Sequence, residues 1–507
     1  MERIYKILFF LAIFTSIIFA SWFALHNTLY FHTDIARDFL LIEDMIVSKK
    51  PALIGPRSGG IPGVFHGPAW LYLNLPVFIL SQGNPAATAW FWVGLTAASI
   101  ALLYFVAKKL SDTRNAFCAT ALYAFAVAES TSNFINPFGA VLFAPLFFYF
   151  FIRYMQKHQF LHLLICLFCI GMTIQFQMAW GVPILILSLP IIMYEMVKSK
   201  KIHHVLSFGI LLLPLSTFIF FDLRHQFLQI KSVINYIVGV SPDKPHVVPI
   251  PFLLSRIQGF LLNMFSFFTQ ENRILNSIFL LIFLILIILF IRHKRKKQGI
   301  ILFPILYFYG GFWILTFLFK GTMWTYYYWP FLPLFCIAIS LLITTVFKKQ
   351  APGIMIALFF VITVLNIARL SKQTNSFFAH NSGFWNFYHT QAVDTYKDAG
   401  AEFGWYVYSA DQYGYSSKYA MHYTQKQYLG IKGYEFSKKP LTYLVIFPST
   451  NKYTSENWWK DNQIKMGKQP DRVFKYEGGS YIEKYTLIPE EQAIPSDRNL
   501  IQDLLFR

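Results

Sequence analysis

Long apolar runs alternate with short polar stretches over most of the chain. About eleven of these runs hold the roughly 17–25 apolar residues that a helix needs to cross the hydrocarbon core of a bilayer. They lie near residues 7–25, 86–107, 115–131, 138–155, 161–177, 180–197, 205–221, 274–291, 300–319, 330–347 and 352–370. The pattern therefore predicts an α-helical polytopic membrane protein with about eleven transmembrane helices.

After about residue 370 the pattern changes to a polar chain with short β-like runs. Residues 406–408 and 441–447 have the composition of strands, and residues 472–485 have that of a hairpin turning at a Gly-Gly pair. The stretches between them could be helical. We therefore expect a membrane domain over residues 1–370 and a small C-terminal α/β domain over residues 371–507.

The composition agrees with a membrane protein. Of the 507 residues, 55% are hydrophobic and 14% are charged, and the mean hydropathy is +0.45. An ordinary soluble protein would carry about 25% charged residues, so that class is excluded. All four cysteines lie in apolar runs. Cys166 and Cys169 form a C-x-x-C inside an expected membrane helix, where a packing role explains them better than redox or zinc chemistry.

The charge distribution indicates topology. There are 44 Lys and Arg against 25 Asp and Glu, a net charge of +19. In a soluble protein this excess would suggest a nucleic-acid partner, but here the basic residues cluster between apolar runs, so we expect no nucleic acid. If the N-terminus is cytoplasmic, every strong cluster lies inside, as the positive-inside rule requires. The first loop, about 26–85, and the C-terminal domain are then extracytoplasmic.

The segment His32-Thr-Asp-Ile-Ala-Arg-Asp38 follows the first expected span directly. Asp34 and Asp38 are four residues apart and share one face if the segment is helical, with Arg37 beside them. Two acids and an arginine at a membrane surface could act on an anionic, lipid-linked substrate. Asp34 could instead cap a helix or pair with Arg37, and Asp38 could orient an acceptor, bind a metal with Asp34 or simply pair with Arg37.

Several short motifs carry a family resemblance. Asp34-Ile-Ala-Arg37 is similar to the Asp-Glu-x-Arg motif in the first outer loop of the GT-C superfamily of glycosyltransferases, with Ile35 in place of the second acid. Phe65–Leu73 is similar to that family's Pro-Pro-Leu-x-Tyr-Trp stretch. Phe221–His225 and the tyrosine-rich stretch before Pro330 also look like family landmarks. The order of motifs most resembles the bacterial branch related to protein O-mannosyltransferases and aminoarabinose transferases.

This resemblance implies a function. Such enzymes move a sugar from a polyprenyl-phosphate carrier to an acceptor on the outer face of the plasma membrane. It implies a hexosyl or pentosyl transferase of the bacterial inner membrane, with a lipid-phosphate sugar as donor and a glycolipid, a cell-wall polymer or a protein as acceptor. Many relatives carry an Asp between spans three and four. Glu129 could serve in its place here, or the chemistry needs no acid in this loop.

The chemistry needs few groups. A polyprenyl phosphate leaves without a general acid, but its growing negative charge must be neutralised by cations. The attacking hydroxyl or amine needs a positioned base. We assign Asp34 as the base, with Asp38 as a second catalytic candidate. Arg37, Arg57 and Arg224 are candidates for the donor phosphate.

Each of these assignments has a plainer alternative. Arg224 could be an interfacial arginine paired with Asp222, and Arg57 could be a solvated loop charge. Four residues are candidates to line the substrate site: His66, Glu129, Tyr327 and Tyr328. They could instead be packing residues or part of an interfacial aromatic belt. Asp34 and Asp38 could hold Mg²⁺ or Mn²⁺ with a phosphate, although nothing in the sequence requires a metal.

Three functions compete at this stage. The leading hypothesis is a glycosyltransferase that inverts the anomeric configuration, because one base and one displacement suffice. A transporter or flippase for a lipid-linked saccharide predicts charges within spans and repeat symmetry, and the sequence shows few such charges and no repeat. An acceptor-binding or assembly protein without catalysis is the third reading.

Overall fold

The computed structural model describes residues 2–239, 249–263, 265–269, 272–292, 296–379, 382–409, 411, 413–448 and 455–497. The chain divides into two compact units. One, here the membrane unit, comprises Met1–Ala20, Pro51–Leu73 and Trp92–Arg369. The other, here the sheet unit, comprises Ser21–Lys50, Asn74–Phe91 and Leu370–Arg507. The expected division into residues 1–370 and 371–507 stays a prediction.

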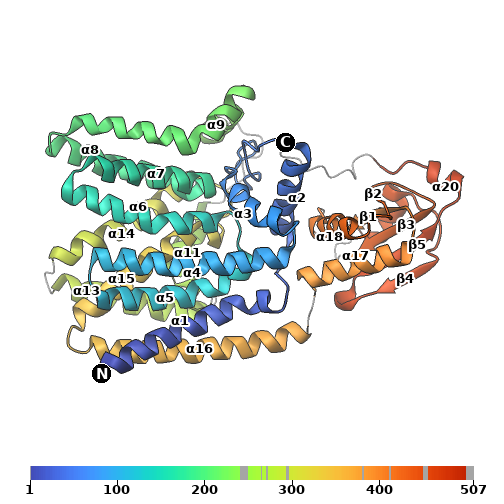
Figure 1. The fold of residues 1–507 in the computed structure, drawn as a ribbon. Coiled ribbons are helices and arrows are strands. Elements are labelled where there is room, and N and C mark those ends of the chain that lie inside the picture. The colour runs from blue at the N-terminus through green and yellow to red at the C-terminus, as the bar shows by residue number, and fades with distance from the viewer. Residues whose placement is uncertain are drawn as a thin grey trace. The chain divides into compact units, whose positions relative to one another are not determined.

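Each of the eleven expected spans coincides with a helix (Figure 1). These helices are α1 (Glu2–Leu25), α4 (Pro85–Leu110), α5 (Thr113–Ser130), α6 (Pro137–Lys157), α7 (Phe160–Phe176), α8 (Met178–Lys198), η2 (Ile202–Leu211) continuing as α9 (Leu212–Arg224), α13 (Arg273–Arg292), α14 (Lys296–Leu315) with η3 (Thr316–Leu318), η5 (Trp329–Phe331) with α15 (Leu332–Val346), and α16 (Ala351–Ala379). Shorter helices are α10 (Leu228–Val238), α11 (Pro249–Asn263), α12 (Ser266–Thr269) and η4 (Thr325–Tyr327).

Nine helices of the described chain are long and apolar enough to cross a membrane. The two expected spans outside that group are α5 and α7, with 18 and 17 residues. The polytopic helical architecture is thus confirmed, while the count of eleven spans stays a prediction.

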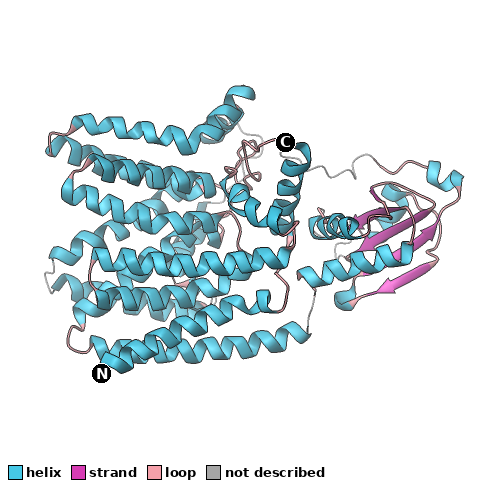
Figure 2. Ribbon diagram, viewed as in Figure 1, coloured by secondary structure: helices cyan, strands magenta, loops and turns pink. Residues whose placement is uncertain are grey.

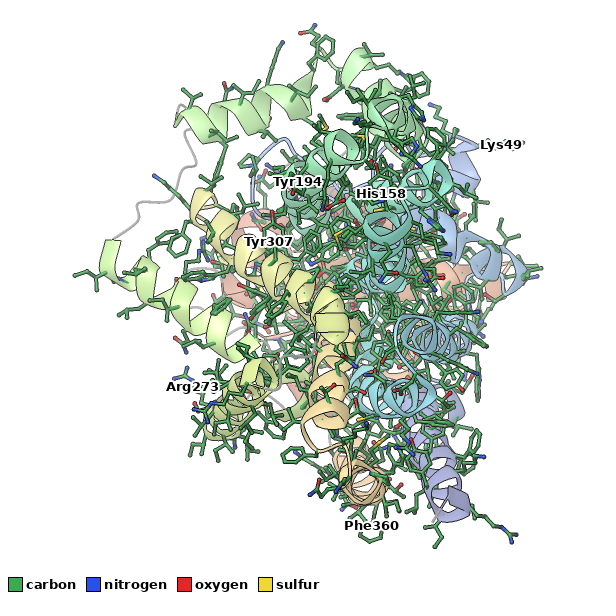
Figure 3. All side chains as sticks on the ribbon, turned by 90° about the vertical axis from the view of Figure 1, so that its left-hand side faces the viewer. Lys49, His158, Tyr194, Arg273, Tyr307 and Phe360 are labelled. Carbon is green, nitrogen blue, oxygen red and sulfur yellow. The ribbon has the colours of Figure 1, made fainter. Side chains whose placement is uncertain are left out.

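The membrane unit is packed through small and aromatic side chains. A Cβ at Gly139 of α6 would overlap the ring of Phe176 on α7, so glycine permits this close approach. The buried Trp180 ring of α8 lies edge-on to Phe331, with centroids 5.4 Å apart. Outward-facing side chains are apolar as well, for example Phe360 on α16 (Figure 3). This is the distribution expected where the surrounding solvent is lipid.

The sheet unit is built on five strands (Figure 2). Their order is β2-β1-β3-β5-β4; β1 is parallel to β2 and β3, and β5 is antiparallel to β3 and β4. The strands are β1 (Phe403–Tyr408), β2 (Gly433–Glu435), β3 (Leu441–Ile446), β4 (Arg472–Lys475) and β5 (Tyr481–Thr486). The expected strands at 406–408 and 441–447 are confirmed, as is the hairpin through Gly478 and Gly479.

The two faces of the sheet are covered differently because successive side chains point to opposite sides. One face carries Tyr406, Tyr408 and Leu444 in an apolar cluster with Trp459. The other face meets the helices α17 (Trp385–Ala399) and α18 (Tyr415–Gln427): the ring of Tyr396 on α17 lies 4.9 Å from that of Phe403. The remaining short helices are α19 (Glu456–Trp458), η6 (Trp459–Ile464), η7 (Glu477–Gly479) and α20 (Pro489–Ala493).

Two pieces of the first loop belong to the sheet unit. Helix α2 (Thr33–Ser48) packs on α18, with the ring of Phe39 5.1 Å from that of Tyr419. The Tyr419 hydroxyl donates to the carbonyl of Gly83, just after α3 (Ala69–Leu80). The Ser416 hydroxyl donates to the carbonyl of Phe31, 2.8 Å away. The helix that carries the acidic motif is therefore fixed by C-terminal residues.

Candidate functional site

Helix α2 begins at the acidic motif for a local reason. His32 is extended, and its Nδ1 accepts a hydrogen bond from the backbone N–H of Asp34 at 3.2 Å, so His32 is the N-cap. Asp34 lies in the first turn, where a negative charge interacts favourably with the helix dipole. On the buried side of α2, Ile35 and Phe39 pack into the sheet unit. The capping role considered for Asp34 thus falls to His32.

Arg37 joins the two acids. Its Nη1 donates to Asp34 Oδ1 at 2.6 Å, while its Nη2 and Nε donate to Asp38 Oδ1 at 2.9 and 3.1 Å. The Asp38 side chain is 6% exposed and that of Asp34 is 47% exposed. Burial disfavours the guanidinium charge, but Asp38 and Asp34 outweigh it and raise the pKa of Arg37. The buried Asp38 therefore fixes Arg37, and Arg37 in turn holds the accessible carboxylate of Asp34.

The pair of carboxylates does not form a ready metal site. Among the described residues, no three His, Cys, Asp or Glu side chains come together as metal ligands. Arg37 also occupies Oδ1 of both Asp34 and Asp38. A Mg²⁺ or Mn²⁺ ion would have to displace Arg37 or take most of its ligands from phosphate oxygens and water.

Glu129 lies on a cavity in the membrane unit. Its Oε2 pairs with Arg369 Nη2 at 3.1 Å, and Arg369 Nη1 donates to the carbonyl of Phe125 at 2.9 Å. The cavity has a volume of about 400 Å³ and is lined by Ala126, Glu129, Ser130, Asn133, Ser266, Phe267, Thr325 and Trp329. A carboxylate at the end of a span should face such a polar space rather than lipid. The Glu129–Arg369 pair was not predicted from the sequence.

The two tyrosines proposed to line the substrate are buried. The Tyr328 ring lies 5.5 Å from that of Phe312, and Tyr327 is packed against Tyr326 at 4.9 Å. Neither residue lines the cavity at Glu129; Thr325 and Trp329 of the same stretch do.

Arg57 and His66 lie on one loop of the membrane unit. The segment pairs with itself: the backbone N–H of His66 donates to the carbonyl of Pro56, and that of Gly55 donates to the carbonyl of His66. Phe65 donates its N–H to Oε1 of Gln229 at 3.0 Å, which pins the loop to α10. The Arg57 side chain is exposed and therefore accessible to a ligand.

Arg224 is also exposed, at the end of α9. The neighbouring carboxylate of Asp222 accepts from the backbone N–H groups of Gln229 and Ile230 at 2.9 and 3.3 Å, so it caps the first turn of α10. This local role for Asp222 had no signal in the sequence, because the cap acts across a turn of irregular length.

The structure therefore groups the candidates as follows. Asp34, Arg37 and Asp38 form one cluster in the sheet unit. In the membrane unit, Glu129 lies with Arg369, and Arg57 shares a loop with His66. Arg256 of α11 donates to the carbonyls of Phe319 and Gly321 at 2.6 and 2.8 Å and holds the loop that contains them.

Comparison with known proteins adds the fold family. No protein-family model matches the sequence, and no curated protein matches it. Among solved structures, ArnT from Cupriavidus metallidurans bound to undecaprenyl phosphate aligns with a TM-score of 0.59 at 10% identity, covering 94% of this chain and 97% of that chain. The chain has the GT-C fold. The apo form of the same ArnT gives a TM-score of 0.55 at 11% identity, covering 91% and 95% of the two chains.

The expected GT-C fold is thus confirmed, and at this identity the likeness concerns the fold alone. The oligosaccharyltransferase of Archaeoglobus fulgidus in complex with Zn and sulfate aligns with a TM-score of 0.47 at 13% identity, over 84% of this chain and 62% of that chain. That similarity is too low to bear on whether this chain binds a metal.

Proposed function

We propose that this protein is a membrane glycosyltransferase that moves one hexosyl or pentosyl group from a polyprenyl-phosphate donor to an acceptor on the outer face of a bacterial plasma membrane. The observation that carries the proposal is the accessible carboxylate of Asp34, held by Arg37 on the helix that follows the first membrane helix. The GT-C fold and the undecaprenyl phosphate bound by the ArnT neighbour support a lipid-phosphate donor. Residues 1–370 form the catalytic membrane domain in this proposal, with the N-terminus cytoplasmic and residues 371–507 outside.

Asp34 acts as the general base. The acceptor hydroxyl or amine attacks the anomeric carbon as its proton passes to Asp34, and the bond between that carbon and the phosphate oxygen breaks. The electron pair leaves with the polyprenyl phosphate, and the new bond forms on the opposite face of the sugar. The product therefore has the inverted anomeric configuration.

Arg37 and Asp38 prepare this base. Arg37 fixes the direction of the Asp34 carboxylate, and Asp38 fixes Arg37 through two N–H groups on one oxygen. A guanidinium shared by two carboxylates has few donors left for a phosphate, so we assign Arg37 first to positioning. Arg57 and Arg224, both exposed, are the remaining candidates to neutralise the departing phosphate.

Glu129 and its cavity are proposed to accommodate part of a substrate. Ser130, Asn133 and Thr325 add hydroxyl and amide groups to the lining, and Trp329 adds an aromatic ring, so the cavity offers hydrogen-bonding groups and an apolar surface together. This combination suits a sugar or a polar lipid headgroup.

The proposal is tested with purified protein in proteoliposomes and synthetic polyprenyl-phosphate sugars labelled in the sugar. A transferase releases polyprenyl phosphate and passes the label to a lipid, glycan or protein acceptor fraction. A flippase moves the intact donor across the bilayer without cleaving it. Transbilayer movement without release over a panel of hexose and pentose donors would overturn the proposal.

A further inference from the structure

A second cavity, in the sheet unit, begins one residue before the proposed base. It has a volume of about 240 Å³ and is lined by Tyr30, His32, Thr33, Gly383, Tyr388, Ser409, Asp411, Gly414, Ser416, Ser417 and Phe447. All of these residues belong to one compact unit. Thr33 is the first residue of α2, and Asp34 is the next. Whatever occupies this cavity therefore lies beside the acidic motif.

The cavity holds a fixed carboxylate. Asp411 Oδ1 accepts from the Ser409 hydroxyl and from the backbone N–H groups of Tyr413 and Gly414, each at 3.1 Å, and Oδ2 accepts from the Thr33 hydroxyl. Burial raises the pKa of Asp411, but these hydrogen bonds outweigh it and lower the pKa below its ordinary value. Asp411 is therefore an anion at neutral pH. With one donor from Thr33, Oδ2 keeps a lone pair for a ligand.

Further hydrogen-bonding groups come from the start of α18. The N-cap of α18 is Gly414, which has no side chain to accept from the first turn. The backbone N–H groups of a first turn have no partner within their helix and are therefore possible donors. The Ser416 hydroxyl donates to the carbonyl of Phe31 and is also hydrogen-bonded to the Tyr388 side chain, so both groups are held in place on the lining. Ser417 adds a second hydroxyl to the lining. The lining thus offers both hydrogen-bond acceptors and donors.

The remaining walls are aromatic. The rings of Tyr388 and Phe447 lie 5.7 Å apart, and Tyr30 stands beside Gly383. Gly383 has φ of +98°, and a Cβ there would approach the Tyr30 ring to 3.3 Å, so a larger residue would be strained and would crowd this wall. Aromatic faces beside hydroxyls and a carboxylate match a ring that is apolar on its C–H face and polar at its edge.

The volume of the cavity and the charge of its lining restrict the kind of ligand that it can bind. A volume of about 240 Å³ holds one sugar ring rather than a chain. Among the lining residues, Asp411 is the one with a formal charge at neutral pH, and none is Lys or Arg. A phosphate or carboxylate would meet repulsion from Asp411, whereas a neutral hydroxyl can donate to it and an ammonium group can pair with it.

We propose that this cavity, between the N-termini of α2 and α18, is a subsite for one neutral or amino-sugar ring of the acceptor. This assignment rests on the proposed transferase function, because it makes the ring part of the group that attacks beside Asp34. The fixed carboxylate of Asp411 selects the ring, and Tyr388 and Phe447 pack on its apolar face.

The test measures binding without any donor. Full-length protein in nanodiscs is titrated by saturation-transfer NMR with methyl glycosides of glucosamine, N-acetylglucosamine, glucose and glucuronic acid. We expect the glucosaminide or the neutral glycosides to bind and the glucuronide not to bind. Asp411→Asn should weaken glucosaminide binding by about fivefold or more, since a charge-assisted hydrogen bond is lost. The matched control, Asp461→Asn at an exposed acid of the same unit, should leave it unchanged.

Tyr388→Phe is the second variant, because it removes one hydroxyl and keeps the ring. It should weaken binding of the neutral glycosides while hydrogen exchange of the strands β1 and β3 stays at the wild-type level. Failure of every glycoside to bind, equal binding of the glucuronide, or identical affinities in wild type and both variants would each overturn the subsite. Transfer activity without this binding would refute the subsite and leave the transferase standing. If neither the wild type nor any variant transfers sugar, but the wild type and Asp34→Asn both bind it, the transferase is refuted and the cavity remains a sugar site.

Discussion

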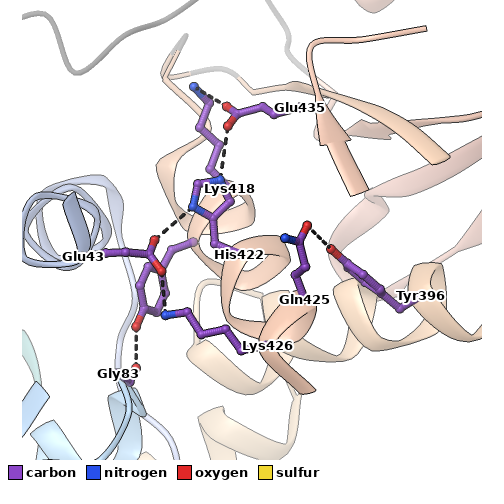
Figure 4. A network of polar contacts seen from close by, with 9 residues as sticks. Glu43, Gly83, Tyr396, Lys418, His422, Gln425, Lys426 and Glu435 are labelled. Carbon is purple, nitrogen blue, oxygen red and sulfur yellow. Dashed lines mark hydrogen bonds and ion pairs between the residues drawn. The ribbon is translucent and has the colours of Figure 1, made fainter. Parts of the chain in front are cut away.

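His422 lies between two carboxylates, so raising the pH should loosen the helix that carries the acidic motif. Its Nδ1 is 3.0 Å from Glu43 Oε2 on α2, and its Nε2 is 3.2 Å from Glu435 Oε2 on β2 (Figure 4). Lys426 pairs with Glu43 at 2.6 Å, and Lys418 pairs with Glu435 at 3.1 Å. Protonated His422 therefore donates an N–H to each of the two carboxylates, whereas neutral His422 has one N–H and can donate to only one of them.

The size of the effect follows from the pKa. Burial lowers the pKa of His422, but hydrogen bonds and charge from Glu43 and Glu435 outweigh it and raise the pKa from 6.5 to about 9. A pKa raised in the folded state contributes its full stability below about pH 6.5 and loses it as the pH rises through about 9. The difference corresponds to about 3 kcal/mol. Because the side chain is 36% exposed, solvent screening reduces this to roughly 1–2 kcal/mol.

The assay is hydrogen exchange of α2 and α18 in nanodiscs between pH 6 and 9.5, corrected for the intrinsic rate. Protection factors in the wild type should fall by about five- to thirtyfold over this range. His422→Gln should be less protected at pH 6 and lose most of the pH dependence, while His203→Gln, at an exposed histidine of the membrane unit, should keep it. Equal protection of wild-type α18 at pH 6 and 9.5, or an unchanged slope in His422→Gln, would refute the reasoning.

Three further changes have definite expected outcomes. Gly67→Ala places a Cβ against Oε1 of Gln175 and should lower the free energy of unfolding by about 1–3 kcal/mol, measured as a lower Tm. The control Gly59→Ala places its Cβ in open space and should leave the Tm unchanged. Equal Tm values for the two variants would contradict the packing of this loop. Glu129→Gln removes the anion that pairs with Arg369, whose side chain is 9% exposed, and should lower the Tm. Adding Arg369→Met to this variant should recover part of the lost Tm. A double variant with no recovery would contradict the pairing. Asp222→Ala removes the cap of α10 and should cost about 1 kcal/mol, seen as faster exchange at Gln229 and Ile230 with α13 unaffected; unchanged exchange there would exclude the cap.

Much of the fold could be predicted because its signals are local. Membrane helices need only a run of apolar residues, and all eleven expected runs coincide with helices. The strands at β1 and β3 and the Gly478–Gly479 hairpin are likewise marked by short-range composition. Arg37 meets Asp34 and Asp38 within one turn of helix, so their pairing could be considered from spacing alone.

What could not be predicted depends on contacts far apart in the sequence. Nothing in the local pattern says that Phe39 packs on Tyr419, so the union of α2 with the C-terminal residues had no signal. The same holds for Glu129 with Arg369 and for Thr33 with Asp411. Each of these contacts depends on a partner that only tertiary folding brings near.

The most direct test of the account compares turnover of a polyprenyl-phosphate sugar by the wild type and by Asp34→Asn, with Asp461→Asn as the matched control. All three proteins are assayed in nanodiscs for release of polyprenyl phosphate, and their folding is checked by Tm. Asp34→Asn should lose at least about a hundredfold in turnover, as expected for a general base, while Asp461→Asn should keep wild-type turnover. Wild-type turnover in a well-folded Asp34→Asn protein would contradict the central claim that this carboxylate is the base.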